Sequence, residues 1–247
     1  LIYGLPKQSL ATMAATMDKV IAADPDRISL YHYAHLPRLF KPQRRILEAD
    51  MPGSAEKLEM LALCIERLTG AGYVYIGMDH FAKPGDDLAV AQRQGRLHRN
   101  FQGYSTHADC DLIGLGVSSI GKVGDSYSQS VKELSQYYAR IDQGLLPVHR
   151  GYRLNADDLL RREVISDLMC HGRIDFGKFE TRHGICFTEY FAEALAQLDE
   201  HVCDGLLEIH HDALVLLPQG HLMMRSAAMA FDAYLGAEQK GLFSRTV

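Results

Sequence analysis

The residues best suited to chemistry lie in one stretch, positions 76–120, where glycines alternate with histidines, basic residues and acids. Glycine lets the backbone approach a ligand closely and adopt positive φ angles, whereas Asp, His, Arg and Gln supply polar groups that orient a ligand. A plain hydrophobic core needs neither at this density. The stretch therefore predicts a binding or catalytic site.

His80 in the sequence GMDHF (77–81) is the first candidate. Asp79 and His80 are neighbours, so in an extended segment they point to opposite sides and each needs its own partner. A histidine here can act as an acid, base or ligand-binding group, or it can be a buried, hydrogen-bonded residue. The residues alone favour neither reading over the other.

Three arginines, Arg93, Arg96 and Arg99, follow at intervals of three residues on a predicted helix. This spacing places them along one broad side of the helix. They form either a solvated helix face or, with His98 and Lys83 nearby, a set of contacts to carboxylate or phosphate groups. The sharper hypothesis is an anionic small molecule.

Two further motifs complete the candidate site. Phe101 and Gln102 in NFQGYST (100–106) combine an aromatic ring with an amide, which suits a group that both stacks and hydrogen-bonds. GLGVSSIG (114–121) is a glycine-rich strand end that contains Ile120. No clear helix follows it as the dinucleotide fingerprint requires, so the motif argues against NAD.

The elements that must position these residues alternate between strand and helix. We expect strands at 1–4, 27–33, 73–76 and 111–116, and helices from Ser9 to Asp24, at 55–68 after a Ser54 cap, and at 131–141. A long connection, 34–53, separates the first two units. This order predicts an α/β sheet or barrel with parallel pairing, and the candidate site beyond the carboxyl ends of its strands.

From about residue 152 the pattern changes to helices at 155–170, 176–183 and 187–198, a hairpin of strands at 206–210 and 213–217, and a last helix at 218–235. The order is typical of a winged-helix module. Residues 151–247 carry 9 basic and 15 acidic side chains, a charge of −6 that disfavours DNA binding. We therefore expect two domains, 1–150 and 151–247, the second serving for docking or as a lid.

Composition is that of an ordinary globular chain, with 247 residues, 47% hydrophobic and 23% charged. No apolar run approaches the roughly 18 residues of a membrane helix. Without an initiator Met or a leader pattern, the chain is expected to be an excised piece of a longer protein. Five widely spaced cysteines without a CxxC pair indicate a reducing cytoplasm and small buried side chains.

Several long motifs in order, YGLPKQ (3–8), YAHLP (33–37), GMDHFAKPGDDLAVAQ (77–92), LHRNFQGYST (97–106) and GLGVSSIG (114–121), resemble the oxygen-independent coproporphyrinogen III oxidases of the radical S-adenosylmethionine superfamily. The resemblance extends through residue 235. It implies the second half of a partial (β/α)6 barrel, followed by a mostly helical, winged-helix-like domain. It also implies the oxidative decarboxylation of two propionates of coproporphyrinogen III, giving protoporphyrinogen IX.

The resemblance carries cofactor and substrate roles onto particular positions. It implies that a 5′-deoxyadenosyl radical, formed from S-adenosylmethionine at a [4Fe-4S] cluster, abstracts hydrogen from the propionate. Ala34 and Ile120 match residues that contact S-adenosylmethionine, and Phe101 and Gln102 match the second cofactor and substrate side. Because the substrate bears four carboxylates, we expect Arg93, Arg99 and His80 to bind it.

The family's cluster motif, CxxxCxxC, lies before YGLPKQ, so the cluster ligands are expected outside this chain, and the fragment alone is expected to be inactive. No catalytic residue and no metal ligand is assigned here. The expected partners are the tetrapyrrole substrate, an electron donor and an electron acceptor, with no nucleic acid or membrane. We expect a cytoplasmic monomer.

One alternative is a related haem-binding or haem-transferring protein that keeps the cofactor without this chemistry. The intact GMDHFA and LHRNFQGY motifs favour the oxidase.

Overall fold

The first strand, helix and strand form as their sequence predicts. The computed structural model describes residues 1–108 and 110–235. Strand β1 (Ile2–Tyr3) leads to helix α1 (Leu10–Ala23), whose first turn is capped by the Ser9 side chain. Strands β2 (Arg27–Ser29) and β3 (Tyr31–His32) follow almost without a break. β1 pairs in parallel with β3, which confirms the predicted βαβ unit.

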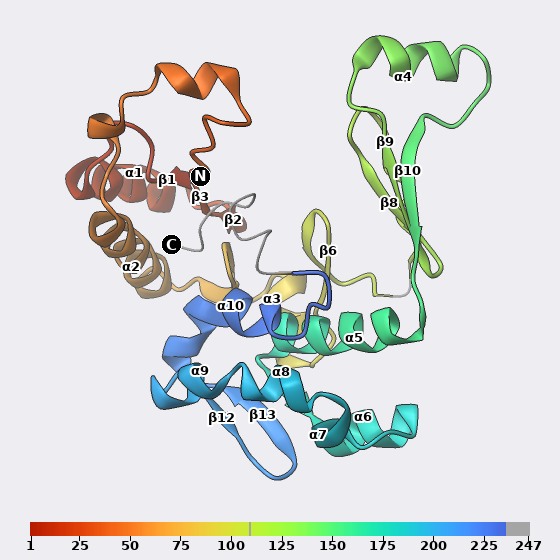
Figure 1. Cartoon of the computed structure of the whole chain (residues 1–247). Helices are drawn as coiled ribbons and strands as arrows, with labels where there is room; N and C mark the ends of the chain where they lie inside the picture. The colour runs from red at the N-terminus through yellow and green to blue at the C-terminus, as the bar shows by residue number, and fades with distance from the viewer. Residues whose placement is uncertain (109, 236–247) are drawn as a thin grey trace.

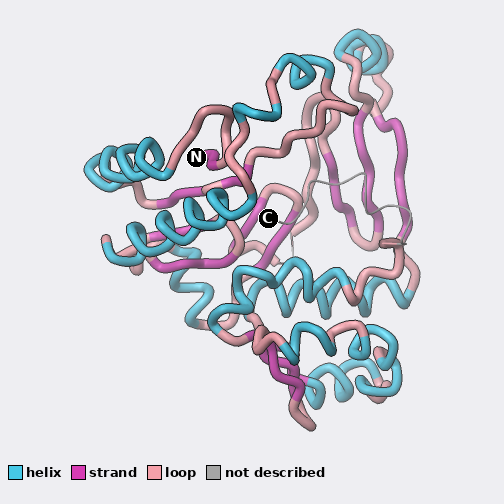
Figure 2. The backbone as a smooth tube through the Cα atoms, turned by 60° about the vertical axis from the view of Figure 1, so that its left-hand side comes forward, coloured by secondary structure: helices cyan, strands magenta, loops and turns pink. Residues whose placement is uncertain are grey.

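A second helix packs beside the first. Two 3-10 turns, η1 (Lys41–Arg45) and η2 (Glu48–Asp50), occupy the long connection before helix α2 (Ser54–Gly70). The expected Ser54 cap is wrong, because Gly53 holds the cap position and no side chain bonds there. α1 and α2 cover a core that contains Met13, Met17 and Met60. Figure 2 shows the two helices side by side.

Strands β4 (Val74–Gly77) and β5 (His80–Ala82) form a separate, antiparallel sheet with β2. β5 lies between β2 and β4, with Ser29 opposite His80 and a register shift between Tyr75 and Gly77. The parallel pairing expected from the alternating pattern therefore holds for β1 and β3, while the sheet that carries His80 folds back on itself.

The helix predicted to carry three arginines is shorter than expected. Helix α3 (Asp87–Arg93) ends at Gln94, and Gly95 follows with a φ of 64°. Arg96 lies in the short loop after the helix, and Arg99 lies in strand β6 (His98–Asn100), which pairs with β7 (Gly103–Ser105). The three arginines therefore share no helix face, because the left-handed glycine ends the helix before the second of them.

An antiparallel arm replaces the strand predicted at 111–116. That segment makes only a bridge between Leu112 and Lys122, because turns that include Gly116 and Ser118 at positive φ interrupt it. The arm consists of β8 (Ile120–Val123), β9 (Ser126–Ser130) and β10 (Val148–Arg153), with helix α4 (Leu134–Ile141) at its end. Figure 1 shows the arm rising away from the body of the molecule.

The C-terminal part agrees closely with its predicted elements. It contains α5 (Ala156–His171), β11 (Arg173–Asp175), α6 (Phe176–His183), α7 (Phe187–Tyr190), α8 (Ala192–Ala196), α9 (Asp199–Cys203), β12 (Leu207–Ile209), β13 (Ala213–Leu216), η3 (Pro218–Met223) and α10 (Met224–Met229). The predicted helix 187–198 is broken at Phe191, and the last helix begins as a 3-10 turn. β11, β13 and β12 form one antiparallel sheet, of which β11 was not predicted.

Separate hydrophobic clusters fill the two ends of the chain. One cluster runs from Val164 to Phe231, and a second covers Tyr3 to Phe81. A third links them, since Cys170 of α5 packs with Ile76 and Tyr104. The domain boundary at 150/151 remains a prediction. No helix within the described residues is long and apolar enough to span a bilayer.

The cysteines only partly follow the expectation that all are small buried side chains. Cys64 and Cys170 are buried, and burial raises the pKa of each thiol to about 11. Cys110, Cys186 and Cys203 are exposed, so the expectation is wrong for them. They lie in a loop, at the cap of α7 and at the end of α9, where the chain is at the surface.

Candidate functional site

Three of the predicted residues line one cavity. Phe101, Gln102 and Ile120 face a hollow of about 490 Å³, whose other walls are Ile113, Gly114, Leu115, Ser118 and Ser119. The β6–β7 hairpin brings Phe101 and Gln102 to its tip, where the Asn100 side chain accepts a hydrogen bond from the Gln102 backbone at 2.8 Å. The Phe101 ring is 54% exposed, so its face is available to a ligand.

The arm and the hairpin both contribute to this cavity. The Phe101 ring packs edge-on against Tyr127 of β9, with 5.1 Å between centroids. Ser119 donates a hydrogen bond to the Gly116 carbonyl at 2.7 Å, which fixes the glycine-rich loop. A Cβ on Gly114 would lie 2.8 Å from the Ile120 carbonyl oxygen, so only glycine allows these two backbone segments to pack this closely. The cavity thus combines an aromatic face, an amide, hydroxyls and aliphatic surface.

A second group of polar side chains lies at the base of the same hairpin. Arg99 and Tyr104 are paired residues of β6 and β7, and the guanidinium lies 5.8 Å from the centre of the Tyr104 ring. The His80 ring packs edge-on against Tyr104 at 5.3 Å and against Tyr31 at 6.2 Å. The hairpin therefore connects the cavity at its tip with these side chains at its base. His80, Arg99 and Tyr104, with the neighbouring Asp79 and Tyr3, form the His80 group.

Two glycines make room for this group. A Cβ on Gly77 would lie 2.5 Å from the Tyr104 hydroxyl, and one on Gly103 would lie 2.9 Å from His80 Nε2. Their φ angles, 144° and 130°, are also ones that other residues rarely adopt. The density of glycine in the sequence here therefore reflects close packing around His80 and Tyr104.

Burial sets the protonation of the His80 group. Burial raises the pKa of Asp79, while the nearby His80, Arg225 and Arg99 oppose that rise. Burial lowers the pKa of His80, so its neutral form is favoured. Burial and the neighbouring Asp79 charge raise the pKa of Tyr3 to about 12, so its hydroxyl stays protonated at neutral pH.

Several buried nitrogens in this part of the chain have no hydrogen-bond partner among the described residues. They are His80 Nδ1, Arg99 Nε, His32 Nε2 and His35 Nδ1. A buried polar atom without a partner costs free energy, and such atoms are uncommon in folded proteins. Their concentration beside the ends of β1, β3 and β4 fits groups that bind a ligand.

The structure does not bring every predicted residue to these two groups. Ala34 follows β3, and its carbonyl accepts a hydrogen bond from Gln43 at 3.0 Å, outside the cavity lining. Arg93 is exposed at the end of α3. Lys83 forms an ion pair with Asp24 at 2.6 Å on the surface. The binding roles of Ala34 and Arg93 stay predictions.

Sequence reasoning missed Arg225 and Tyr104. Arg225 belongs to α10 and lies close enough for its charge to act on Asp79, although 145 positions separate them. Nothing in the local sequence of α10 indicates that contact. Tyr104 lies inside the NFQGYST motif. Recognising a β-hairpin there would have placed Tyr104 opposite Arg99.

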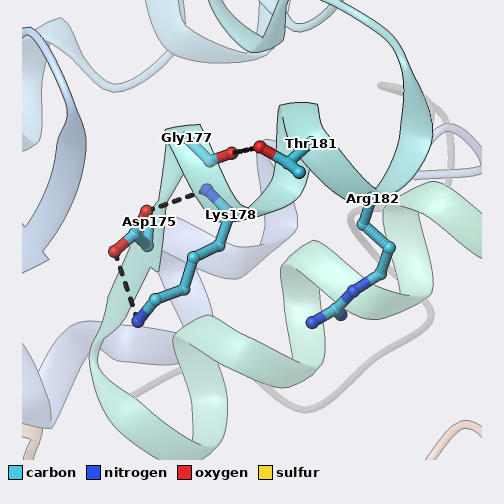
Figure 3. Close-up of a pocket in the computed structure, with 5 residues that line it drawn as sticks. All are labelled: Asp175, Gly177, Lys178, Thr181 and Arg182. Carbon is cyan, nitrogen blue, oxygen red and sulfur yellow. Dashed lines mark hydrogen bonds and ion pairs between the residues drawn. The ribbon is translucent and has the colours of Figure 1, made fainter.

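A larger hollow, of about 650 Å³, lies elsewhere, along α6 (Figure 3). Its lining comes from Asp175 and α6, and these residues largely bond to one another. Asp175 accepts from the Lys178 backbone at 3.0 Å, and Thr181 donates to the Gly177 carbonyl at 2.7 Å. Arg182 pairs with Glu163. These side chains cap and stabilise helix α6, so we assign no site to this hollow.

Comparison with known proteins identifies relatives along the entire chain. Residues 154–223 match the family model described as the HemN C-terminal domain. An oxygen-independent coproporphyrinogen III oxidase of Pseudomonas aeruginosa is 49% identical over 247 residues, all of this chain and 54% of the relative. The enzyme of that name from Thermostichus vulcanus is 45% identical, and the chain covers 76% of it.

A solved structure supports the same relationship. The coproporphyrinogen III oxidase (HemN) of Escherichia coli, described as a radical SAM enzyme, superposes with a TM-score of 0.91 and 47% identity over 95% of this chain. The chain covers 54% of that structure, and it spans about half the length of most curated relatives it matches. The predicted α/β fold, the second half of a radical-SAM barrel with a helical C-terminal domain, is confirmed.

Proposed function

This chain belongs to the family of oxygen-independent coproporphyrinogen III oxidases, and we propose that it acts, as part of a full-length enzyme, in converting coproporphyrinogen III to protoporphyrinogen IX. The reaction is the oxidative decarboxylation of two propionates to vinyl groups. The observation that carries the proposal is that His80 Nδ1 and Arg99 Nε are buried without a partner among the described residues, on and against the hairpin whose tip lines the first cavity.

Arg99 and His80 are the groups we assign to substrate carboxylates. Arg99 is half-buried and its Nε has no partner among the described residues, so a carboxylate would gain a charge-assisted hydrogen bond at little cost in desolvation. His80 offers a ring whose lowered pKa favours the neutral form and whose Nδ1 has no partner among the residues that the structure describes. Arg93 remains a proposed carboxylate contact at the outer edge, where solvent weakens it.

We assign the first cavity to S-adenosylmethionine. The Phe101 ring would stack on the adenine, the Gln102 amide would donate and accept hydrogen bonds, and Ile120 would cover the ribose side with apolar surface. Ala34 is proposed to complete the contact from the loop after β3. When bound and cleaved reductively, S-adenosylmethionine supplies hydrogen-atom abstraction from the propionate.

The described residues do not fit an iron–sulfur cluster. They contain no group of three or more His, Cys, Asp or Glu side chains arranged to hold a metal, and a [4Fe–4S] cluster needs converging thiolates. We propose that the cluster ligands belong to the part of the relatives that this chain does not cover. Together with this function we propose an electron donor and an electron acceptor as partners. We also propose a cytoplasmic location and a monomeric state.

The proposal is tested by assaying the full-length enzyme, anaerobically and with its cluster reconstituted, for conversion of coproporphyrinogen III. We expect Arg99→Ala to raise KM about tenfold or more, and Arg93→Ala to raise it less, while neither prevents cleavage of S-adenosylmethionine. Arg173→Ala, an exposed cation of β11, is the control for loss of a positive charge.

Two results would count against the proposal. Absence of protoporphyrinogen IX together with tight haem binding would favour the haem-transfer alternative. Wild-type KM in both Arg99→Ala and Arg93→Ala would show that these arginines do not meet the substrate.

A further inference from the structure

Helix α4, at the end of the arm, adds no side chain to the hydrophobic clusters of the described chain. Of its eight residues, all of which the structure describes, only Tyr137 is partly buried. Leu134, Tyr138 and Ile141 are exposed. A helix of this kind gains little free energy from burial, so its position depends on particular contacts.

The contact that Tyr137 makes leads to the first cavity. Its hydroxyl accepts a hydrogen bond from the Gly116 N–H at 3.0 Å. Gly116 belongs to the glycine-rich loop, residues 114–119. Four members of this loop line the cavity: Gly114, Leu115, Ser118 and Ser119. Tyr137 is not among the lining residues, so it reaches the cavity only through the backbone of the loop.

The glycine-rich loop has a backbone that its neighbours must hold in place. Gly116 has a φ of 95° and Ser118 a φ of 57°. A positive φ is unfavourable for a residue with a Cβ, and it persists where surrounding contacts enforce it. The Ser118 N–H donates to the Val131 carbonyl at 2.8 Å, and the Gln129 amide donates to the Ser118 carbonyl at 3.2 Å. The strand β9 side of the loop is therefore fixed by hydrogen bonds.

Gly116 is held at both of its backbone polar groups. The Ser119 hydroxyl donates to its carbonyl at 2.7 Å, and Tyr137 accepts from its N–H. The Tyr137 bond joins the loop to α4, across 21 positions of the chain. The helix is in turn attached to β10, because Arg140 donates to the Val148 carbonyl at 3.0 Å. A continuous set of contacts thus runs from β10 through α4 to the wall of the cavity.

Tyr138 gives an internal comparison for Tyr137. The two tyrosines are neighbours in one helix, but the Tyr138 side chain is 56% exposed and its hydroxyl has no hydrogen bond to a described residue. Tyrosine is a modest helix former, so the helix itself requires it at neither position. What distinguishes Tyr137 is the contact of its hydroxyl with Gly116.

We propose that Tyr137 is a positioning residue for S-adenosylmethionine, which holds the glycine-rich loop, through Gly116, in the shape that forms one wall of the cavity. This inference rests on the proposed function, because it takes the cavity to be the cofactor site. It gives α4 a role although the helix does not line the cavity. A loop that is ordered beforehand binds more tightly, since less conformational freedom is lost when the ligand arrives.

The experiment compares Tyr137→Phe with Tyr138→Phe in the full-length enzyme, prepared anaerobically with its cluster reconstituted. Each change removes one hydroxyl and keeps the ring. Equilibrium dialysis measures the dissociation constants of S-adenosylmethionine and of coproporphyrinogen III. We expect Tyr137→Phe to weaken S-adenosylmethionine binding about fivefold, the size expected for one neutral hydrogen bond, and to leave coproporphyrinogen binding within twofold. Tyr138→Phe should change neither.

Two further measurements separate positioning of the loop from a general loss of structure. Hydrogen exchange at the Gly116 amide should be faster in Tyr137→Phe than in the unaltered enzyme, and saturating S-adenosylmethionine should slow it again. In turnover, KM for S-adenosylmethionine should rise about fivefold while kcat stays within twofold. A purely structural role would instead lower kcat and the thermal midpoint with KM unchanged.

Unaltered affinity for S-adenosylmethionine in Tyr137→Phe would overturn the proposal, as would an equal loss of both ligands or an equal effect in Tyr138→Phe. If Tyr137→Phe does not fold, exchange in the unaltered enzyme decides, because a Gly116 amide that exchanges as fast as an unprotected one has no bond to Tyr137. Failure of the proposed function is distinguishable, since it appears as absence of protoporphyrinogen IX from the unaltered enzyme.

Discussion

Asp79 and Asp158 represent two regions of this molecule that treat buried polar groups in different ways. In the C-terminal region Asp158 is enclosed and fully bonded, and α5 and α6 both begin with side-chain caps. In the region of β3 to β7, Asp79 is only partly buried, and four buried nitrogens, His32 Nε2, His35 Nδ1, His80 Nδ1 and Arg99 Nε, have no hydrogen-bond partner among the described residues. The C-terminal region contains such groups too, since Arg162 Nη1 and His201 Nδ1 have no partner among the described residues, but four of the six lie between His32 and Arg99.

The hydrophobic groups differ in the same way. The C-terminal core joins Phe176, Phe179, Phe187 and Phe191 in aromatic contacts, with Phe176 and Phe187 stacked 4.4 Å apart. Phe101, by contrast, is more than half exposed at the tip of a hairpin. The same residue type can therefore stabilise the fold or remain available to a ligand. Which of the two it does depends on how far its side chain is buried and on the side chains it contacts.

The largest effect is expected from breaking the aromatic core. Phe187 is fully buried, so Phe187→Ala should lower the free energy of unfolding by about 3–5 kcal/mol. Phe101→Ala is the contrasting variant, which should change stability by less than about 0.5 kcal/mol and weaken S-adenosylmethionine binding. Urea unfolding and equilibrium dialysis of the full-length protein measure both. Similar stability losses in the two variants would remove the distinction between the regions.

A charge placed in the cavity tests whether its apolar wall serves the cofactor. Ile120→Asp would set a carboxylate against the bound nucleoside with no partner, so we expect S-adenosylmethionine binding to fall about a hundredfold. Ile120→Val keeps the apolar surface and should lose less than threefold. Direct binding measurements on full-length protein, with the cluster content determined in parallel, decide the matter. Tight binding by Ile120→Asp would place the cofactor elsewhere.

The two glycines Gly103 and Gly95 provide a sharper test of the His80 group. Both have positive φ, so alanine strains the backbone at either one. Only at Gly103 does the new methyl meet His80, because nothing lies within 4 Å of a Cβ on Gly95. Gly103→Ala should therefore weaken substrate binding about tenfold in dialysis, while Gly95→Ala should lose only stability. Equal binding in both would indicate that His80 is not part of the site.

The smallest expected effect is on how the free energy of unfolding changes with pH. The hydrogen bonds from Asn155 and Tyr234 lower the pKa of Asp158 in the folded chain, so its stabilisation is present above about pH 4, the pKa range of an unfolded aspartate, and is lost as the pH falls through the folded pKa. Burial raises the pKa of Asp79, so ionised Asp79 opposes folding above its folded pKa, and acidification relieves that cost.

At pH 7, Asp158→Asn should therefore lower the free energy of unfolding, by about 1–3 kcal/mol, whereas Asp79→Asn should raise it. The difference for Asp79→Asn should shrink towards pH 4, whereas the difference for Asp158→Asn should persist to about pH 4 and shrink only below it. Urea unfolding of the full-length variants at the two pH values measures them. A loss of stability in Asp79→Asn at pH 7 would mean that its carboxylate has a structural partner.

The sequence by itself determined the elements whose signals are local. The Ser9 and Asn155 caps, the apolar spacing of α1, α2 and α5, and the turn at 210–212 all depend on residues a few positions apart. The motifs also identified the family, and they placed Phe101, Gln102 and Ile120 in one candidate site. The hairpin tip and the glycine-rich loop that carry these residues are set by short-range backbone preferences, whereas their meeting in one cavity is not.

Only the tertiary structure decided how distant segments meet. The same glycine that predicted a site also ended α3 early, so Arg99 left the expected helix for β6, where it joins His80 instead of Arg93. The antiparallel return of β5 between β2 and β4, the arm that brings Ile120 to Phe101, and the approach of Arg225 to Asp79 all join residues far apart in the chain. Local propensity carries no information on such pairings, because their energy comes from burial and electrostatics that exist only once the chain has folded.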